Sequence, residues 1–192
     1  MSVESVFEHL RKFASEFNAP PGYTRPEISQ NEITMMMSPS SRHQLIARRL
    51  RVDLDPQVQQ SHPGYVAETG PGVEDPARGI LRYPDLIVAE EAAMETLAEG
   101  IDPAAVMLAA EIVSPSNPEN DYVGKLRDYP AMGIEHYLIV DPREGVVIHH
   151  FAPEAAAYAN TLKYAFGDTV PVGPWNIGTT GFLRYADPTT PH

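Results

Sequence analysis

The sequence contains no cysteine, which excludes disulfide bonds, thiolate metal sites and cysteine nucleophiles together. It also lacks any apolar run near the ~18 residues that a membrane span requires. Its first residues have neither the basic start nor the long apolar stretch of a signal peptide. From these absences we expect a cytoplasmic protein with no membrane anchor.

Basic side chains are scarce, because 14 Lys and Arg stand against 26 Asp and Glu, giving a net charge of −12. Residues 1–64 hold 7 basic and 7 acidic side chains, so the whole acidic excess lies in residues 65–192. This balance argues against strong nonspecific binding to nucleic acid, whose affinity comes mostly from phosphate neutralisation. It does not exclude a nucleic-acid enzyme, since a site for a divalent cation must be acidic before the cation arrives.

The length of 192 residues favours one domain, and a hydrophobic share of 43% is typical of a globular protein. Three apolar runs predict buried strands, and the residues between the last two predict a helix. The expected strands are 84–89, 106–113, 135–141, 146–151 and 158–166, and the expected helices are 3–17, 42–54 and 119–132. The tail from Gly173 onward is expected to be a loop with one short element near Phe182. The pattern predicts a mixed sheet with helices on its faces, an α/β or α+β domain.

Two carboxylates stand where this sheet would bury them: Asp85 begins one apolar strand, and Glu111 lies near the end of the next. A buried carboxylate is costly unless it is paired or binds a cation, and two on neighbouring strands repel each other. Lys125, one of only three lysines, lies on the helix that follows. A lysine there would stabilise charge on a phosphoryl group or orient an attacking water. These three residues are candidates for chemistry at a cation such as Mg²⁺.

Each candidate also has a purely structural interpretation. Asp85 could be an ordinary turn residue, and Glu111 could belong to a buried ion pair. Lys125 lies four residues after Asp121, an order that stabilises a helix. His43, on an apolar helical stripe, is more often a core histidine than a ligand. Taken one by one, these residues do not identify a site.

The order of five motifs, however, resembles one family. The first motif is a strand-turn-strand, and the second is a helix start of the form Ser-Pro-Ser. The third is a strand that begins with Pro-Asp, the fourth is a strand end of the form Glu-x-x-Ser-Pro-Ser, and the fifth is a strand that ends in Asp-Pro. These segments are 25–33, 38–44, 84–88, 111–116 and 133–142. Together they resemble the Uma2 family of restriction-endonuclease-like proteins, a branch of the PD-(D/E)XK nuclease superfamily, over roughly residues 23–182.

The resemblance implies a restriction-endonuclease-like fold, with a central mixed β-sheet of four or five strands flanked by helices. It also implies a Mg²⁺ or Mn²⁺ cofactor and hydrolysis of DNA phosphodiester bonds. In this pattern Asp85 and Glu111 are the metal carboxylates, and Lys125 is a displaced catalytic lysine. Glu32, and less certainly Glu27, would face the same site.

Further roles also rest on the resemblance. The superfamily has a lysine two residues after the glutamate, where this chain has Val113, whose backbone carbonyl could still serve the metal. The lysine role then depends on Lys125 reaching in from its helix. The residues expected to bind substrate are His43, Arg42, Arg48, Arg49 and Ser114.

Two other hypotheses stay open at this point. One is a nuclease-fold binding or scaffold module that has lost turnover, supported by Val113 and the acidic surface. The other is a hydrolase acting on something other than nucleic acid, since a fold does not fix a substrate. We expect an N-terminal helix and linker (1–22), one Uma2-like domain (23–185) and a short tail (186–192). Apolar edge strands also predict a homodimer, in which two sites would cut two strands.

Overall fold

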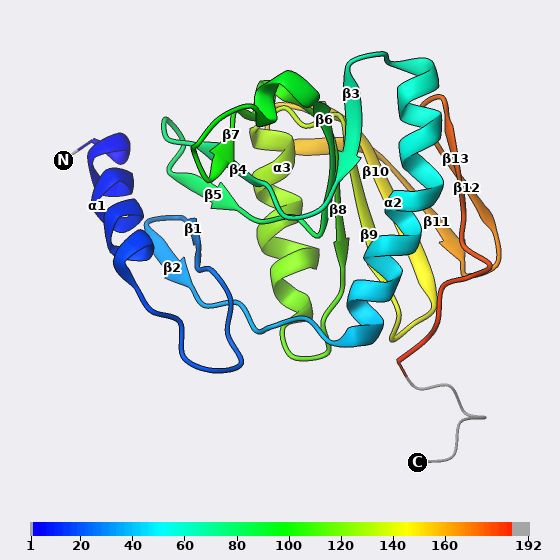
Figure 1. Ribbon diagram of the computed structural model, residues 1–192, viewed down its shortest axis with the longest axis horizontal. Coiled ribbons are helices and arrows are strands. Elements are labelled where there is room, and N and C mark those ends of the chain that lie inside the picture. The colour runs from blue at the N-terminus through cyan, green and yellow to red at the C-terminus, as the bar shows by residue number, and fades with distance from the viewer. Residues whose placement is uncertain (1, 186–192) are drawn as a thin grey trace.

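Six strands form the central sheet of the computed structural model, which describes residues 2–185 (Figure 1). Their order is β11-β10-β9-β8-β6-β3, and only β8 and β9 are parallel neighbours. The strands are β3 (Tyr65–Glu68), β6 (Leu86–Glu90), β8 (Val106–Ile112), β9 (His136–Asp141), β10 (Val146–Glu154) and β11 (Ala157–Ala165). The expected mixed sheet is confirmed, with one strand more than the largest number expected.

Both faces of this sheet are covered, which explains why its central strands are apolar at nearly every position. Alternate residues of a strand point to opposite faces. Leu86 and Val88 accordingly lie in the core cluster beneath helix α2 (Ser41–Ser61), whereas Ile87 and Ala89 lie in the cluster beneath helix α3 (Leu126–Ala131). On β8, Glu111 points to the α3 face, where it meets side chains of that helix.

Helix α2 (Ser41–Ser61) begins after Ser40, whose hydroxyl accepts a hydrogen bond from an amide of the first turn. The expected end near Leu54 is wrong, because the helix continues through Pro56 for two more turns. Proline removes one backbone donor and usually ends a helix. Here the apolar stripe continues past it to Val58, which is fully buried on the sheet. Tertiary packing therefore outweighs the local effect of proline.

A two-part helix connects the parallel strands β8 and β9. It starts as a π-helix, η3 (Asn120–Lys125), and continues as α3 (Leu126–Ala131). The sequence predicts one regular α-helix here, so the π-helical first half is a correction. Single π-turns are rare and occur mostly at functional sites. In this one, Asp121 and Lys125 share a buried face. Gly133 ends the helix at a φ of 81°, a conformation that glycine adopts without strain.

A second sheet, of five strands in the order β2-β1-β5-β4-β7, holds the N-terminal part of the chain. Its hairpin turns through Gln30 and Asn31, which both have positive φ, as a two-residue turn of this kind requires. Helix α1 (Val3–Glu16) packs on this sheet through Phe7 against Ile28. The strands are β1 (Glu27–Ser29), β2 (Glu32–Thr34), β4 (Gly72–Asp75), β5 (Ile80–Arg82) and β7 (Gly100–Ile101).

A hairpin of β12 (Thr169–Val172) and β13 (Trp175–Gly178) lies at the opposite end of the molecule from α1 (Figure 1). The expected loop from Gly173 onward is therefore wrong, because Trp175 forms a strand and completes the core beneath α2. Two short turns, η1 (Glu91–Met94) and η2 (Pro103–Ala105), complete the elements. Within residues 2–185, no helix has the length and hydropathy that a membrane crossing needs. The expected tail, 186–192, lies outside the described residues.

Candidate active site

Lys125 is surrounded by carboxylates. Its Nζ lies 2.7 Å from Glu111 Oε2, 3.2 Å from Asp121 Oδ1 and 3.6 Å from Glu27 Oε1. All four residues are buried. Asp85 adds a fourth negative charge that acts on Glu111 and Lys125. We call Glu27, Asp85, Glu111 and Asp121 the carboxylate cluster.

The central sheet positions Asp85 against Glu111. Continuing the antiparallel register of β6 and β8 by one residue places these two side chains opposite each other. Oδ2 of Asp85 accepts a hydrogen bond from the Ile112 amide at 2.7 Å, and Oδ1 lies 2.7 Å from His43 Nε2. The carboxylate is therefore fixed between strand β8 and the first turn of α2.

The helix between β8 and β9 holds the other side of the cluster. Tyr129 donates a hydrogen bond to Glu111 Oε1 at 2.5 Å, and Tyr137 donates one to the backbone carbonyl of Asp121 at 2.9 Å. Both tyrosines are fully buried, and their rings meet edge to face. The second oxygen of Glu111 remains available to Lys125, so each oxygen of this carboxylate has a defined partner.

Glu27 reaches the cluster from the smaller sheet. Its Oε1 accepts a hydrogen bond from the Tyr83 amide at 3.1 Å. Its Oε2 accepts from Arg82 Nη1 at 2.7 Å and from Asn120 Nδ2 at 3.2 Å. Arg82 also donates to Asp128 at 2.6 Å, deep inside the protein. This buried network joins the hairpin β1–β2 to the helix that carries Lys125.

Burial and crowding move the pKa values of these groups in different directions. Burial raises the pKa of Glu111 well above its usual range, Lys125 opposes the shift, and the other three carboxylates add to it. The pKa of Asp121 is raised in the same way. Burial alone would lower the pKa of Lys125, but the surrounding acids outweigh it and raise the pKa. The pKa of Glu27 is lowered despite its burial, because Lys125 and Arg82 both face it.

The donor set of the cluster fits a hard divalent cation. Its donors are carboxylate oxygens, which Mg²⁺ and Mn²⁺ prefer, and four carboxylates around one lysine leave an excess of negative charge. No three His, Asp or Glu side chains within residues 2–185 are spaced as a ready-made ion cage. Lys125 lies among the acids instead, so a cation beside Asp85 would share the Glu111 carboxylate with Lys125.

A cavity of about 1150 Å³ opens onto this cluster. The side chain of Asp85 is 22% exposed and that of His43 is 10% exposed, whereas Glu111 and Lys125 are nearly inaccessible. A ligand would therefore meet Asp85 and His43 first. Met35, Met36 and Met37 form part of the apolar wall of the same cavity.

The structure separates the residues expected to bind substrate into two groups. His43 and Ser114 line the cavity, but Arg42 and Arg49 do not. Arg42 donates to two consecutive backbone carbonyls near the C-terminal end, that of Tyr185 at 2.9 Å. Arg49 donates to another carbonyl of the same segment. Both guanidinium groups thus hold the chain itself, which corrects the expectation that they face a substrate.

Two further arginines of α2 do reach the rim of the cavity, Arg48 and Arg51. Arg51 is paired with Glu68 at 2.9 Å. Arg48 is exposed and makes no hydrogen bond or ion pair with any described residue. Of these two, Arg48 is the one whose guanidinium is free to meet a phosphate.

Glu32 does not reach the cavity, contrary to expectation. It is exposed and lies opposite Ser29, next to the hairpin turn. Glu27, at the other end of β1, is the glutamate that reaches Lys125. The two-residue turn fixes this register and so decides which glutamate faces inward.

Val113 also lies outside the cavity lining, which does not support a role for its carbonyl. Its side chain is buried in the core beneath α3, and its amide donates to the Val140 carbonyl at 2.8 Å. The residues on either side, Ile112 and Ser114, line the cavity instead.

Sequence reasoning gives no site role to three residues that the structure places here. Asp121 and Tyr129 each lie four residues from Lys125, so helical spacing around the lysine is the signal that identifies them. Tyr185 offers no such signal, because distant segments bring it to the cavity. Burial raises the pKa of Tyr185 to about 12, and the charge of Asp85 adds to this effect.

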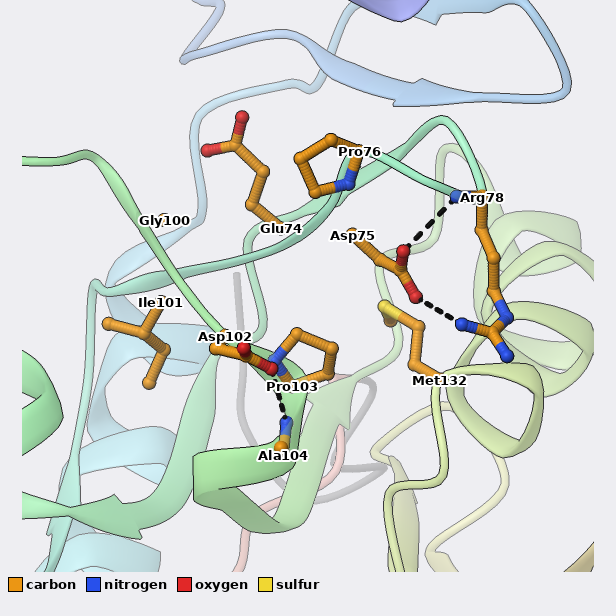
Figure 2. Close-up of a pocket in the computed structure, with 10 residues that line it drawn as sticks. All are labelled: Glu74, Asp75, Pro76, Arg78, Gly100, Ile101, Asp102, Pro103, Ala104 and Met132. Atoms are coloured by element: carbon orange, nitrogen blue, oxygen red, sulfur yellow. Dashed lines mark hydrogen bonds and ion pairs between the residues drawn. The ribbon is translucent and has the colours of Figure 1, made fainter. Parts of the chain in front are cut away.

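A second hollow, on the smaller sheet, has a volume of about 500 Å³. Figure 2 shows the residues that line it. Its acids have partners within the chain. Asp75 accepts hydrogen bonds from the amide and the guanidinium of Arg78, and Asp102 accepts one from the Ala104 amide at 2.8 Å. This hollow contains no lysine and no member of the carboxylate cluster. The chemistry therefore concentrates in the larger cavity.

Comparison with known proteins places the chain in a family. The Uma2 family model, described as "Putative restriction endonuclease", matches residues 14–175. The crystal structure of "a putative nuclease belonging to DUF820" from Anabaena variabilis ATCC 29413 is similar, with a TM-score of 0.65 and 15% sequence identity, over 86% of this chain and 88% of that one. No curated protein matches. Because the family model covers most of the sequence, this protein belongs to the Uma2 family.

Proposed function

We propose that this protein is a metal-dependent endonuclease that hydrolyses DNA phosphodiester bonds in the cavity above Asp85, Glu111 and Lys125. The observation that carries the proposal is one buried lysine facing several carboxylates at the floor of an open cavity. Membership of a family described as "Putative restriction endonuclease" supports the same reaction class. The fold alone would not identify a substrate.

Asp85 and Glu111 are the residues that would hold the cation. When bound there, a divalent cation would supply a water of lowered pKa and would neutralise charge on the phosphate. Glu27 and Asp121 would add negative charge behind it. Oxygen ligands of this kind favour Mg²⁺ or Mn²⁺ over softer metals.

The chain's own residues would hold and orient the groups that react. Lys125 keeps the Glu111 carboxylate in place and contributes positive charge near the phosphate. His43 fixes the orientation of Asp85. Arg48, at the rim, would bind a neighbouring phosphate of the strand.

A non-catalytic binding module is the second candidate. It is favoured by Lys125, which partly neutralises the cluster without a metal, and by the lack of a preformed ion cage within residues 2–185. Such a module would bind nucleic acid in the cavity without cleaving it. A homodimer and a cytoplasmic location stay predictions in either case.

The test compares the wild-type protein with Glu111→Gln and Glu32→Gln. The two substitutions remove the same charge, but only Glu111 is buried in the cluster, while Glu32 is exposed outside the cavity. Nicking of supercoiled plasmid is followed with Mg²⁺, Mn²⁺ or EDTA, and Mn²⁺ binding is measured by calorimetry. We expect nicking and Mn²⁺ binding in the wild type and Glu32→Gln, and loss of both in Glu111→Gln.

Other outcomes lead to different conclusions. Mn²⁺ binding without cleavage of plasmid or labelled RNA would favour the binding module. Equal nicking by Glu111→Gln and the wild type would exclude this cavity as the nuclease site. No Mn²⁺ binding by the wild type would refute the metal-dependent mechanism.

A further inference from the structure

The C-terminal end of the described chain reaches the cavity through Tyr185. Residues 179–185, which we call the closing segment, run from the β12–β13 hairpin to Tyr185. Thr179, at its start, is fully buried and donates to the Asp168 carbonyl at 2.7 Å. Phe182 is buried against Phe166, with ring centroids 5.5 Å apart. The closing segment is therefore packed onto the core.

Two arginines of α2 hold the backbone of the closing segment. Arg49 donates to the carbonyl of Gly181, and Arg42 donates to the carbonyls of Arg184 and Tyr185. From the other side, the Tyr185 amide donates to the Pro142 carbonyl, just after β9, at 3.1 Å. The last described residue is thus fixed between α2 and the end of the central sheet.

These contacts bring Tyr185 to the candidate active site. Its side chain lines the same cavity as Asp85 and His43. Its hydroxyl has no hydrogen-bond partner among residues 2–185, whereas both oxygens of Asp85 already have partners. Arg42 and His43 are adjacent in the first turn of α2, so this turn orients Tyr185 and Asp85 together.

We propose that Tyr185 is a substrate-contacting residue, whose hydroxyl donates a hydrogen bond to a non-bridging phosphate oxygen of a DNA strand bound beside Asp85, and that Arg42 is a positioning residue that holds Tyr185 there. This inference rests on the proposed function. A neutral donor suits this cavity, because it binds a phosphate oxygen without forming a salt bridge with the nearby carboxylates. The proposal also gives a positioning role to Arg42, which the sequence predicts to bind the substrate directly.

The test measures nicking rates at several plasmid concentrations for the wild type, Tyr185→Phe, Tyr185→Ala and Arg42→Ala. Tyr164→Phe is the matched control, since Tyr164 lies on β11 and outside the cavity lining. A hydrogen bond to a charged oxygen predicts that Tyr185→Phe lowers kcat/KM by roughly 10-fold or more. Tyr164→Phe should match the wild type.

A positioning role for Arg42 makes a separate prediction. Arg42→Ala should lower kcat/KM and speed hydrogen exchange in residues 179–185, and Arg42→Lys should restore part of both. In the Tyr185→Phe background, Arg42→Ala should have little further effect, because the two substitutions remove one contact. Fully additive losses would overturn the positioning role.

Two results would overturn the contact made by Tyr185. One is equal kcat/KM for Tyr185→Phe and the wild type; the other is a loss confined to Tyr185→Ala, which would indicate a ring contact in place of the hydrogen bond. Affinity for a labelled single-stranded oligonucleotide in Ca²⁺ is measured on the same variants. An inactive wild type would refute the proposed function alone. In that case, a weaker affinity of Tyr185→Phe for the oligonucleotide would support this inference, and an unchanged affinity would overturn it.

Discussion

Replacing Lys125 with methionine tests how the carboxylate cluster is held in the protein. Methionine keeps an unbranched side chain of similar length and removes only the charged group. In the native protein that group lies within 4 Å of Glu111, Asp121 and Glu27, and the lysine side chain is 3% exposed. The variant would leave these acids crowded together without their shared cation.

Removing one partner of a buried ion pair destabilises a protein by about 3–5 kcal/mol. This is a large part of the 5–15 kcal/mol that keeps a typical domain folded. In a domain of this size the melting temperature should fall by roughly 6–20 °C. The deficit should shrink as the pH is lowered from 8 toward 5.5. The pKa of Glu111 is already raised by burial, and loss of Lys125 raises it further, so the variant relieves repulsion by binding protons.

Urea unfolding in EDTA measures this difference, with Lys163→Met as the matched control because Lys163 is exposed on β11. A divalent cation should partly replace the missing charge, and Mn²⁺ at 100 times its Kd would restore about 2.7 kcal/mol. A Lys125→Met protein within about 1 kcal/mol of the wild type at pH 8 would refute the argument that the lysine holds the cluster together.

Three further predictions follow from other contacts. Burial and the neighbouring His136 and His150 lower the pKa of His149 to about 4, so as the pH falls His149 is protonated in the unfolded chain before it is protonated in the folded protein. The free energy of unfolding should therefore drop by about 3 kcal/mol between pH 6.5 and 4, and His149→Phe should lack this component in urea titrations. Tyr129→Phe leaves an oxygen of Glu111 without its donor and should lower the free energy of unfolding by about 1–3 kcal/mol, measured against Tyr164→Phe. Arg48→Ala should reduce the slope of log affinity for labelled DNA against log salt by about 0.7–0.9, the contribution of one phosphate, and an unchanged slope would exclude that contact.

The central sheet could be predicted from sequence because its strands are buried on both faces. A long apolar run such as 106–113 has few alternatives in a protein of this size, and Glu111, the one charged residue in it, is conspicuous for the same reason. Lys125 could be found because the chain has so few lysines. The roles of these residues in catalysis stay predictions.

Features that depend on distant contacts could not be predicted. From the local sequence, Pro56 predicts the end of a helix. Only the packing of the helix on the central sheet shows why it continues. From the sequence, Arg42 and Arg49 are predicted to bind phosphate, because nothing near them in the chain indicates that their guanidinium groups donate to backbone carbonyls of the closing segment. Glu27 and Glu32 lie in the same short segment, so the sequence does not tell which of them faces the cavity. The register of the hairpin decides this.

The π-helical turn from Asn120 to Lys125 allows this part of the site to tolerate the loss of one residue. A π-turn accommodates one residue more than an α-helix of the same span. Deleting a single residue there, such as Gly124, would let the turn become α-helical, and the residues on either side would keep their relative positions. Asp121 would then lie three residues before Lys125 and would still share its face, while Tyr129 would stay in place beneath Glu111. The same loss in the α-helical half, between Lys125 and Tyr129, would instead turn one of these side chains about 100° away from the other, so that they could no longer both contact Glu111.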